Sequence, residues 1–207
     1  RRSMAEESSP AAPQQGLSRQ EIVAKLSQVP VFSIVNENMS MVMGTDKTTG
    51  KPNAVWYTDP GDARSVLMSA QAQMPDMKLH LGVTPLGTAF AIAAGWMADP
   101  FPTGTKVTLQ ASRAVVAEFA NELKKQLAAQ DLDPECFQFP LFCMDEMQSP
   151  NMLPMFLSRA DMAATWDASG RQGPMPEAAT VMDLRVLVKQ MQTPIFDWRT
   201  VNFVSSQ

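Results

Sequence analysis

The stretch Val29-Pro30-Val31-Phe32 returns later in the chain as Phe139-Pro140-Leu141-Phe142. Two further anchors repeat in the same order: Val55-Trp56-Tyr57-Thr58 as Met155-Phe156-Leu157-Ser158, and Val83-Thr84-Pro85-Leu86 as Val181-Met182-Asp183-Leu184. Three anchors in one order indicate a duplicated unit whose halves pack as one pseudo-symmetric body. Such a body favours a binding scaffold over a catalytic pocket.

Hydrophobic periodicity predicts strands alternating with helices in both halves. Ser18 with Glu21 forms a capping box, and Asp59-Pro60 supplies a cap and a proline at a helix start. In the first half we expect a helix over 18–28, strands over 31–35, 40–43 and 54–57, a helix from 59, a strand over 78–83 and a helix over 86–97. In the second half we expect a strand over 106–109, a helix over 112–130, strands over 141–144 and 155–157, a helix from 158, a strand over 180–182 and a helix over 184–191. The pattern predicts an α/β body (α+β, with mixed sheets), in which helices cover one face of each sheet.

The chain divides by composition into four segments. We expect a flexible tail over 1–17, a first repeat over 18–98, a second repeat with its leading long helix over 99–192, and an aromatic extension over 193–207. The tail is rich in Ala, Ser, Pro and Gln, which predicts disorder in isolation, and it resembles what remains after a targeting segment is removed.

Composition and charge exclude two classes of partner. Hydrophobic residues make up 45% and charged residues 18% of the 207 residues. The longest nearly apolar run, 86–98, is shorter than the roughly 20 residues of a membrane-spanning helix. The net charge of -4 provides no basic field for a phosphate backbone, so we expect neither a membrane span nor nucleic-acid binding.

Catalytic and metal-binding signatures are missing from the sequence. The one histidine, His80, lies in a strand-like segment and is expected to be structural or solvent-facing, and no phosphate loop, dinucleotide fingerprint or nucleophile turn is present. Asp145-Glu146 is expected to be a solvated pair. The cysteines Cys136 and Cys143 are expected to be reduced and buried, although a disulfide depends on geometry. We therefore predict no enzyme activity, no metal and no cofactor.

Methionine is unusually frequent, with 16 residues. It concentrates at Met39, Met41 and Met43, and again at Met144, Met147, Met152 and Met155. Flexible thioethers either fill irregular gaps in a core or form an adaptable docking surface, and the sequence leaves both open.

Aromatic residues concentrate beyond the last predicted helix, at Phe196, Trp198 and Phe203. They either cap the core or anchor a partner. A strand over 200–204 could pair with a sheet edge of this chain or of another protein. The predicted partner-binding residues are Met39, Met41, Met43, Phe142, Phe196, Trp198 and Phe203.

Several motifs together resemble the Tic22-like family. In the first half these are Val-Pro-Val-Phe-Ser-Ile from Val29, Ala-Val-Trp-Tyr-Thr from Ala54, and Leu-Gly-Val-Thr-Pro-Leu-Gly-Thr-Ala-Phe from Leu81. In the second half, Phe-Pro-Leu-Phe, Met-Phe-Leu-Ser-Arg-Ala-Asp and Val-Met-Asp-Leu continue the resemblance, which spans residues 18–192. The resemblance implies a duplicated, non-enzymatic α/β body of the plastid inner-envelope import translocon or its cyanobacterial relatives.

Two functions follow as hypotheses. The first, implied by the resemblance, is chaperone-like binding of precursor proteins during import, in the envelope intermembrane space. The alternative is a structural subunit at the periphery of a large thylakoid membrane complex, such as a photosystem with its light-harvesting antennae.

Overall fold

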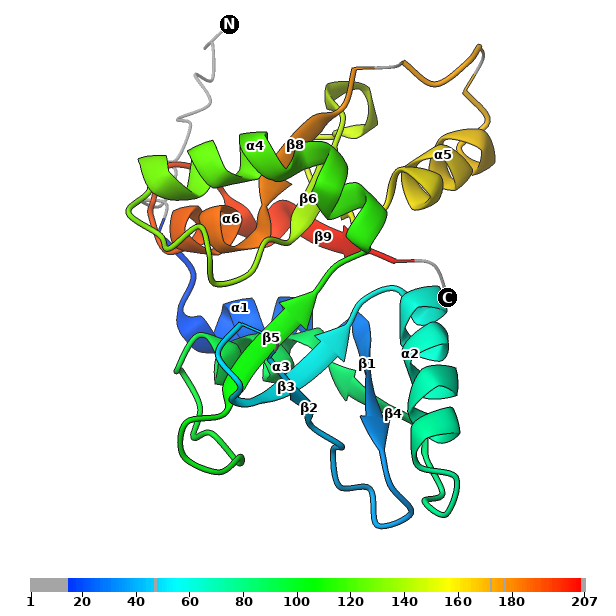
Figure 1. Cartoon of the computed structure of the whole chain (residues 1–207). Coiled ribbons are helices and arrows are strands. Elements are labelled where there is room, and N and C mark those ends of the chain that lie inside the picture. Colours follow the sequence, from blue (N-terminus) through cyan, green and yellow to red (C-terminus); the bar gives the residue numbers. More distant parts are fainter. Residues whose placement is uncertain (1–14, 47, 172, 177, 206–207) are drawn as a thin grey trace, which may run out of the picture.

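The computed structural model describes residues 15–205, except residues 47, 172 and 177 (Figure 1). The first half contains α1 (Arg19–Leu26), β1 (Pro30–Val35), β2 (Gly44–Thr45), β3 (Pro52–Tyr57), α2 (Pro60–Gln73), β4 (His80–Pro85), α3 (Leu86–Ala93) and β5 (Lys106–Gln110). The second half contains α4 (Arg113–Ala129), β6 (Pro140–Cys143), the 3-10 turn η1 (Asp145–Met147), β7 (Leu153–Phe156), α5 (Arg159–Ala168), β8 (Thr180–Asp183), α6 (Leu184–Met191), the 3-10 turn η2 (Trp198–Thr200) and β9 (Val201–Val204). The predicted α/β class with mixed sheets is confirmed.

The two sheets repeat one topology. In the first sheet β1 pairs antiparallel with both β3 and β4, and β3 pairs parallel with β5. In the second sheet β6 pairs antiparallel with both β7 and β8, and β7 pairs parallel with β9. The start of the helix that follows each sheet is also held in the same way. At the start of α3, Leu86 N donates to Val29 O, and at the start of α6, Leu184 N donates to Phe139 O, both at 2.8 Å. The predicted duplication is therefore visible in the hydrogen-bonding pattern.

The strand register corrects one of the three anchors. Phe32 pairs with Tyr57, and Phe142 pairs with Phe156, so Tyr57 corresponds to Phe156. The anchor read from the sequence matches Tyr57 with Leu157, which is one position too far. Since alternate strand residues face opposite sides of a sheet, that slip would exchange core and outer faces. The anchors at Pro30 and at Leu86 are in the correct register.

Helices cover both faces of each sheet, so the expectation of one covered face was wrong. On the first sheet α1 and α3 pack on the inner face, which carries the main core, and α2 packs on the outer face (Figure 1). On the second sheet α6 packs on the inner face and α5 on the outer face. The physical reason is that most of these strands carry apolar side chains on both faces, and both must be shielded from water.

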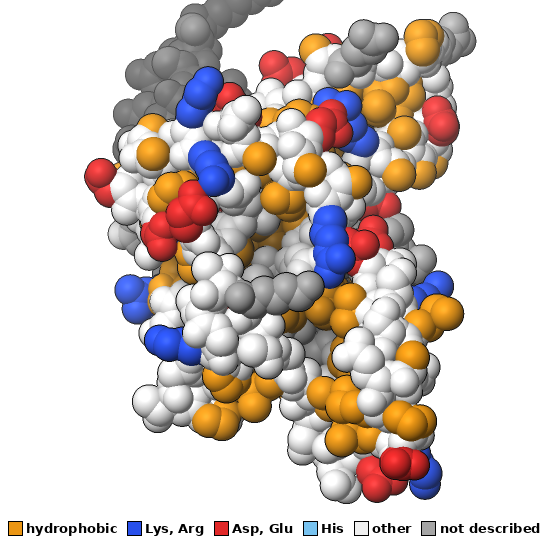
Figure 2. Space-filling model, viewed as in Figure 1, with side chains coloured by type: hydrophobic (Ala, Val, Ile, Leu, Met, Phe, Trp, Pro, Cys, Tyr) orange, Lys and Arg blue, Asp and Glu red, His pale blue; other side chains and the backbone are white. Residues whose placement is uncertain are grey.

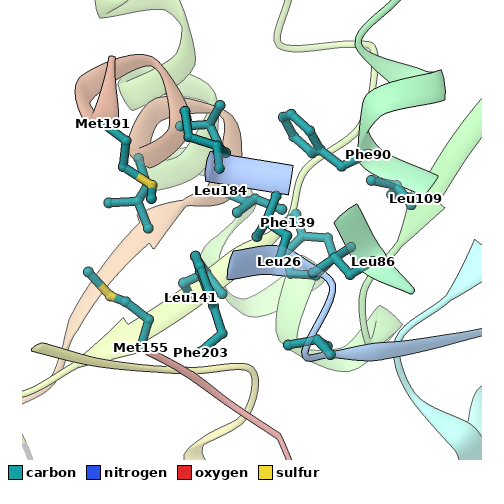
Figure 3. Close-up of a cluster of buried hydrophobic side chains, with 14 of the residues drawn as sticks. Leu26, Leu86, Phe90, Leu109, Phe139, Leu141, Met155, Leu184, Met191 and Phe203 are labelled. Carbon is teal, nitrogen blue, oxygen red and sulfur yellow. The ribbon is translucent and has the colours of Figure 1, made fainter. Parts of the chain in front are cut away.

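The main core is shared between the halves. Figure 3 shows side chains from α1, α3 and β5 meeting side chains from β6, β7, β9 and α6. Its labelled members are Leu26, Leu86, Phe90, Leu109, Phe139, Leu141, Met155, Leu184, Met191 and Phe203. A single apolar cluster that draws on both repeats makes the halves mutually dependent for burial.

Some segments differ from the predicted elements. The predicted strand over 40–43 is reduced to one bridge between Val35 and Met41, and the short strand β2 lies in the segment between the predicted strands 40–43 and 54–57. The strand β5 pairs within the first sheet, although the division by composition placed it after residue 98. Likewise β9, from the predicted extension, pairs with the chain's own β7.

The N-terminal capping box at Ser18 is confirmed, with Ser18 and Glu21 bonding reciprocally. Residue Leu17, at the end of the predicted tail, is buried and its N–H donates to Met191 O at 2.7 Å. Most of that tail, residues 1–14, lies outside the described part of the structure. Within the described residues, no helix combines the length and the apolar character needed to cross a membrane.

Candidate protein-binding groove

The structure separates the seven predicted partner-binding residues into three groups. Met39 and Phe196 are exposed, at 65% and 40%, and Met41 and Met43 are half-buried. The other three predicted residues, Phe142, Trp198 and Phe203, are buried. The prediction that Phe142, Trp198 and Phe203 contact a partner is therefore wrong, because their side chains are buried in the chain's own core.

A groove lies between α2 and the outer face of the first sheet. Its volume is ≈ 370 Å³. The strands contribute Ile34, Val55 and Tyr57 to its floor, and α2 contributes Val66 and Ala70 to its wall. The remaining lining residues are Val42, Met43, Gly44, Thr45, Asn53, Ser69, Gln73 and Met74. We call this feature the α2 groove.

The groove continues at the C-terminal end of α2 into a second hollow of ≈ 550 Å³. Gln73 and Met74 line both, and the second hollow is otherwise formed by the turn 36–38 and the loop 75–78. Figure 2 shows hydrophobic side chains gathering over this lower part of the first half.

The matching position in the second half is filled instead of open. There α5 and the outer face of the second sheet enclose a buried cluster made of Phe142, Met144, Met147, Phe156, Met162 and Trp166. The helix caps Asp59 and Ser158 are equivalent in the fold. By that equivalence, α2 carries Ala63 where α5 carries Met162, and Leu67 where α5 carries Trp166. Smaller side chains on α2 leave space above the strands, which is why the groove exists.

Methionines surround the α2 groove. Met43 and Met74 line it, and Met77 lines the adjoining hollow. Met39 lies on the turn beside the hollow, with its Sδ 3.3 Å from Nε2 of His80. The sequence pattern found Met39 and Met43 but missed Met74 and Met77, whose spacing along the chain gave no sign that α2 would bring them to the same place.

The α2 groove is lined by uncharged side chains. Burial raises the pKa of the Tyr57 phenol, so this side chain stays neutral at physiological pH. The ion pair of Lys106 and Asp46 lies outside the groove, with Nζ of Lys106 2.8 Å from Oδ2 of Asp46. This contact lowers the pKa of the Asp46 carboxyl, and the N–H groups of Thr49 and Thr48, which donate to the same carboxyl, lower it further. An uncharged lining with flexible thioethers suits apolar side chains of varied shape.

Within the described residues, nothing groups three or more metal-ligating side chains. His80 and the pair Asp145-Glu146 are exposed, as predicted. Cys136 and Cys143 are both free, but only Cys143 is buried, so the expectation of two buried thiols was wrong for Cys136. Burial, with the nearby Asp145 charge, raises the pKa of the Cys143 thiol and keeps it protonated.

Comparison with known proteins places this fold among the Tic22 proteins. Residues 2–101 match the model of the Tic22-like family. The solved structure of Tic22 from Plasmodium falciparum aligns with a TM-score of 0.62 and 17% identity, covering 89% of this chain and 91% of the other. The solved structure of Anabaena Tic22, described as a protein-transport protein, aligns with a TM-score of 0.59 and 17% identity, covering 92% and 93%. A comparison with curated protein sequences finds no significant match.

Proposed function

We propose that this chain, which is Tic22-like in sequence over residues 2–101 and shares the Tic22 fold over most of its length, is a non-enzymatic protein-binding scaffold of a plastid. Its role is to hold apolar segments of precursor proteins during import, in the manner of a chaperone. The observation that carries this proposal is the α2 groove, which stays open where the equivalent site in the second half is packed shut.

The chemistry of the groove supports an unspecific apolar client. Precursor proteins differ in sequence, so a surface that binds many of them needs to adapt to side chains of different shapes. Unbranched thioethers such as those of Met43 and Met74 change rotamer at low cost and are polarizable. The uncharged lining also avoids the desolvation cost that a buried, unpaired charge would impose on an apolar client.

The alternative role, a peripheral subunit of a thylakoid photosystem complex, is not favoured. The two solved structures compared above are Tic22 proteins, and the Anabaena protein carries a protein-transport description. Trp198 and Phe203 are also buried, so they are not available to anchor the chain on such a complex.

Replacing Met43 and Met74 together by Gln is expected to weaken client binding severalfold. The change preserves approximate side-chain volume but introduces an amide that must lose hydration when an apolar client binds. The measurement is suppression of the aggregation of an unfolded model client, by light scattering, as a function of the concentration of this protein. The wild type should suppress aggregation at lower concentrations than the double variant.

The matched control replaces Met97 and Met152 by Gln. Both are exposed, at 49% and 42%, and neither lines the α2 groove. This control should suppress aggregation as the wild type does. Equal suppression by the groove variant and the wild type would remove the groove from the proposal, and failure of the wild type itself to suppress aggregation would refute the chaperone-like role.

A further inference from the structure

The α2 groove contains thioether sulfur atoms that solvent can reach. Met43 and Met74 line the groove and are half-buried, and Met77 lines the adjoining hollow and is 43% exposed. The buried cluster under α5, at the equivalent site of the second half, holds its methionines away from water, because Met147 and Met162 are only 6% and 1% exposed. The chain therefore has accessible thioethers at the open site and shielded thioethers at the closed one.

Accessible thioethers react with hydroperoxides. In this reaction a lone pair of the methionine sulfur attacks the terminal oxygen of the hydroperoxide, so that a sulfur–oxygen bond forms while the oxygen–oxygen bond breaks. The proton of the terminal oxygen passes to the leaving oxygen, which departs as an alcohol, or as water when the reagent is hydrogen peroxide. The sulfur is oxidised by two electrons to a sulfoxide, and the hydroperoxide is reduced by the same two electrons.

A sulfoxide makes the groove polar. Its oxygen is hydrated in the empty groove, and an apolar client would remove that water without replacing the hydrogen bonds. The groove also offers donors that stabilise the oxidised side chains, because the amides of Asn53 and Gln73 line it and Thr105 Oγ1 lies 3.9 Å from Met43 Sδ. Oxidation should therefore weaken the binding of apolar clients.

We propose that Met43 and Met74 are a modification site, where oxidation by a hydroperoxide releases apolar clients and methionine sulfoxide reductase restores binding. This inference rests on the function proposed above, because it assigns a chemical control to the same groove. The core should survive the same treatment, since Met144, Met155 and Met191 are exposed by 2% or less.

Position distinguishes Met43 and Met74 from other accessible methionines. Met68 lies on α2 itself and is 70% exposed, and Met97 is 49% exposed, so peroxide reaches both. Neither lines the groove, and their oxidation should leave clients bound. Met68 and Met97 therefore provide matched controls.

The first measurement locates the reaction on the full chain. Hydrogen peroxide is added in stages, and mass spectrometry of peptides follows the addition of one oxygen to each methionine. Met43 and Met74 should react at least about tenfold faster than the buried Met155 and Met162, while circular dichroism stays unchanged. Unmodified Met43 and Met74 at a dose that fully oxidises Met68 would overturn the proposal.

Oxidation of cysteine is removed from the measurement by a dithiol added after the peroxide. Cys136 is exposed and free, so it also reacts. The dithiol reverses disulfides and sulfenic acids of cysteine but leaves the methionine sulfoxides, which require their own reductases.

The second measurement is suppression of the aggregation of an unfolded model client. Peroxide should weaken suppression by the wild type severalfold, and the two methionine sulfoxide reductases should restore it as Met43 and Met74 lose their added oxygen. The variant with Met43→Leu and Met74→Leu has an apolar groove without sulfur, so its suppression should be the same before and after peroxide. The control with Met68→Leu and Met97→Leu should respond to peroxide as the wild type does.

The outcomes separate this inference from the function on which it rests. A wild type that suppresses aggregation equally before and after both groove methionines are oxidised would overturn the inference and leave the proposed function standing. The same holds if peroxide weakens the leucine variant of the groove as much as the wild type. A wild type that does not suppress aggregation even before peroxide is added would refute both.

Discussion

Replacing Gly87 by Ala is expected to destabilise the folded chain by about 2 kcal/mol or more. A Cβ at position 87 would lie 2.1 Å from Val23 O and 2.4 Å from Ser27 Oγ, so α3 touches the backbone of α1 at this glycine. Alanine favours a helix over glycine by about 1 kcal/mol, but that gain is smaller than the cost of separating two helices of the main core. The steric conflict therefore outweighs the gain in helix propensity, and Gly87→Ala is expected to lower the free energy of unfolding.

Urea unfolding followed by circular dichroism measures this effect. Gly44→Ala is the matched control, because a Cβ there meets nothing within 4 Å. The control should change the free energy of unfolding by less than about 0.5 kcal/mol. A Gly87→Ala protein as stable as the wild type would mean that α1 and α3 do not pack as described.

Replacing Asp183 by Ala is expected to cost about 3 kcal/mol. This fully buried carboxylate accepts hydrogen bonds from Phe139 N at 2.9 Å and from Arg185 N at 2.8 Å. It caps α6 and fixes the start of β6 at once, and alanine would leave a buried N–H without a partner. The equivalent position in the first half is Pro85, whose helix has no side-chain cap. The measurement is again the free energy of unfolding.

The same residue predicts a pH dependence. Burial raises the pKa of the Asp183 carboxyl, and the N–H groups of Phe139 and Arg185 oppose this only in part. The folded state therefore binds the proton more tightly than the unfolded chain, so this contribution to stability is present in acid and is lost as pH rises through the folded pKa. The stability difference between wild type and Asp183→Ala should be largest below about pH 4, the ordinary range of an Asp, and smaller at neutral pH.

Asp183→Asn is the control for the predicted direction of the pH dependence. It has a similar shape and no titrating proton, so the difference between Asn and Ala variants should not vary with pH. A wild-type advantage that grows from acid to neutral pH would show that the hydrogen bonds to the carboxylate outweigh the effect of burial.

The sequence predicted the position and type of most elements, because caps and periodicity act over a few residues. The capping box at Ser18 and the Asp59-Pro60 start of α2 are both found where the pattern placed them. The prediction of a strand over 40–43 was wrong. The alternation of the segment resembles that of a strand, but only Met41 forms a bridge there. A strand requires a partner with free backbone groups, and local pattern carries no information about that partner.

For the candidate site, the sequence found part of the surface. The methionine clustering included Met39 and Met43, which lie at the α2 groove or beside it, and their role in binding a partner stays a prediction. It could not separate them from Met144 and Met155, which are buried. Both groups have similar composition and spacing, and burial depends on what the opposite element supplies.

By itself the sequence determined the duplication, the fold class and the absence of familiar catalytic motifs, since repeated anchors and local periodicity are written along the chain. Only the tertiary structure decided where the two copies diverge. The outer face under α5 is filled by Met162 and Trp166, but the one under α2 is left open. The carbonyl of Val201 in β9 accepts a hydrogen bond from Lys25, a contact that β5 lacks among the described residues. These differences arise from side chains distant in sequence meeting across elements, a property that no local pattern contains.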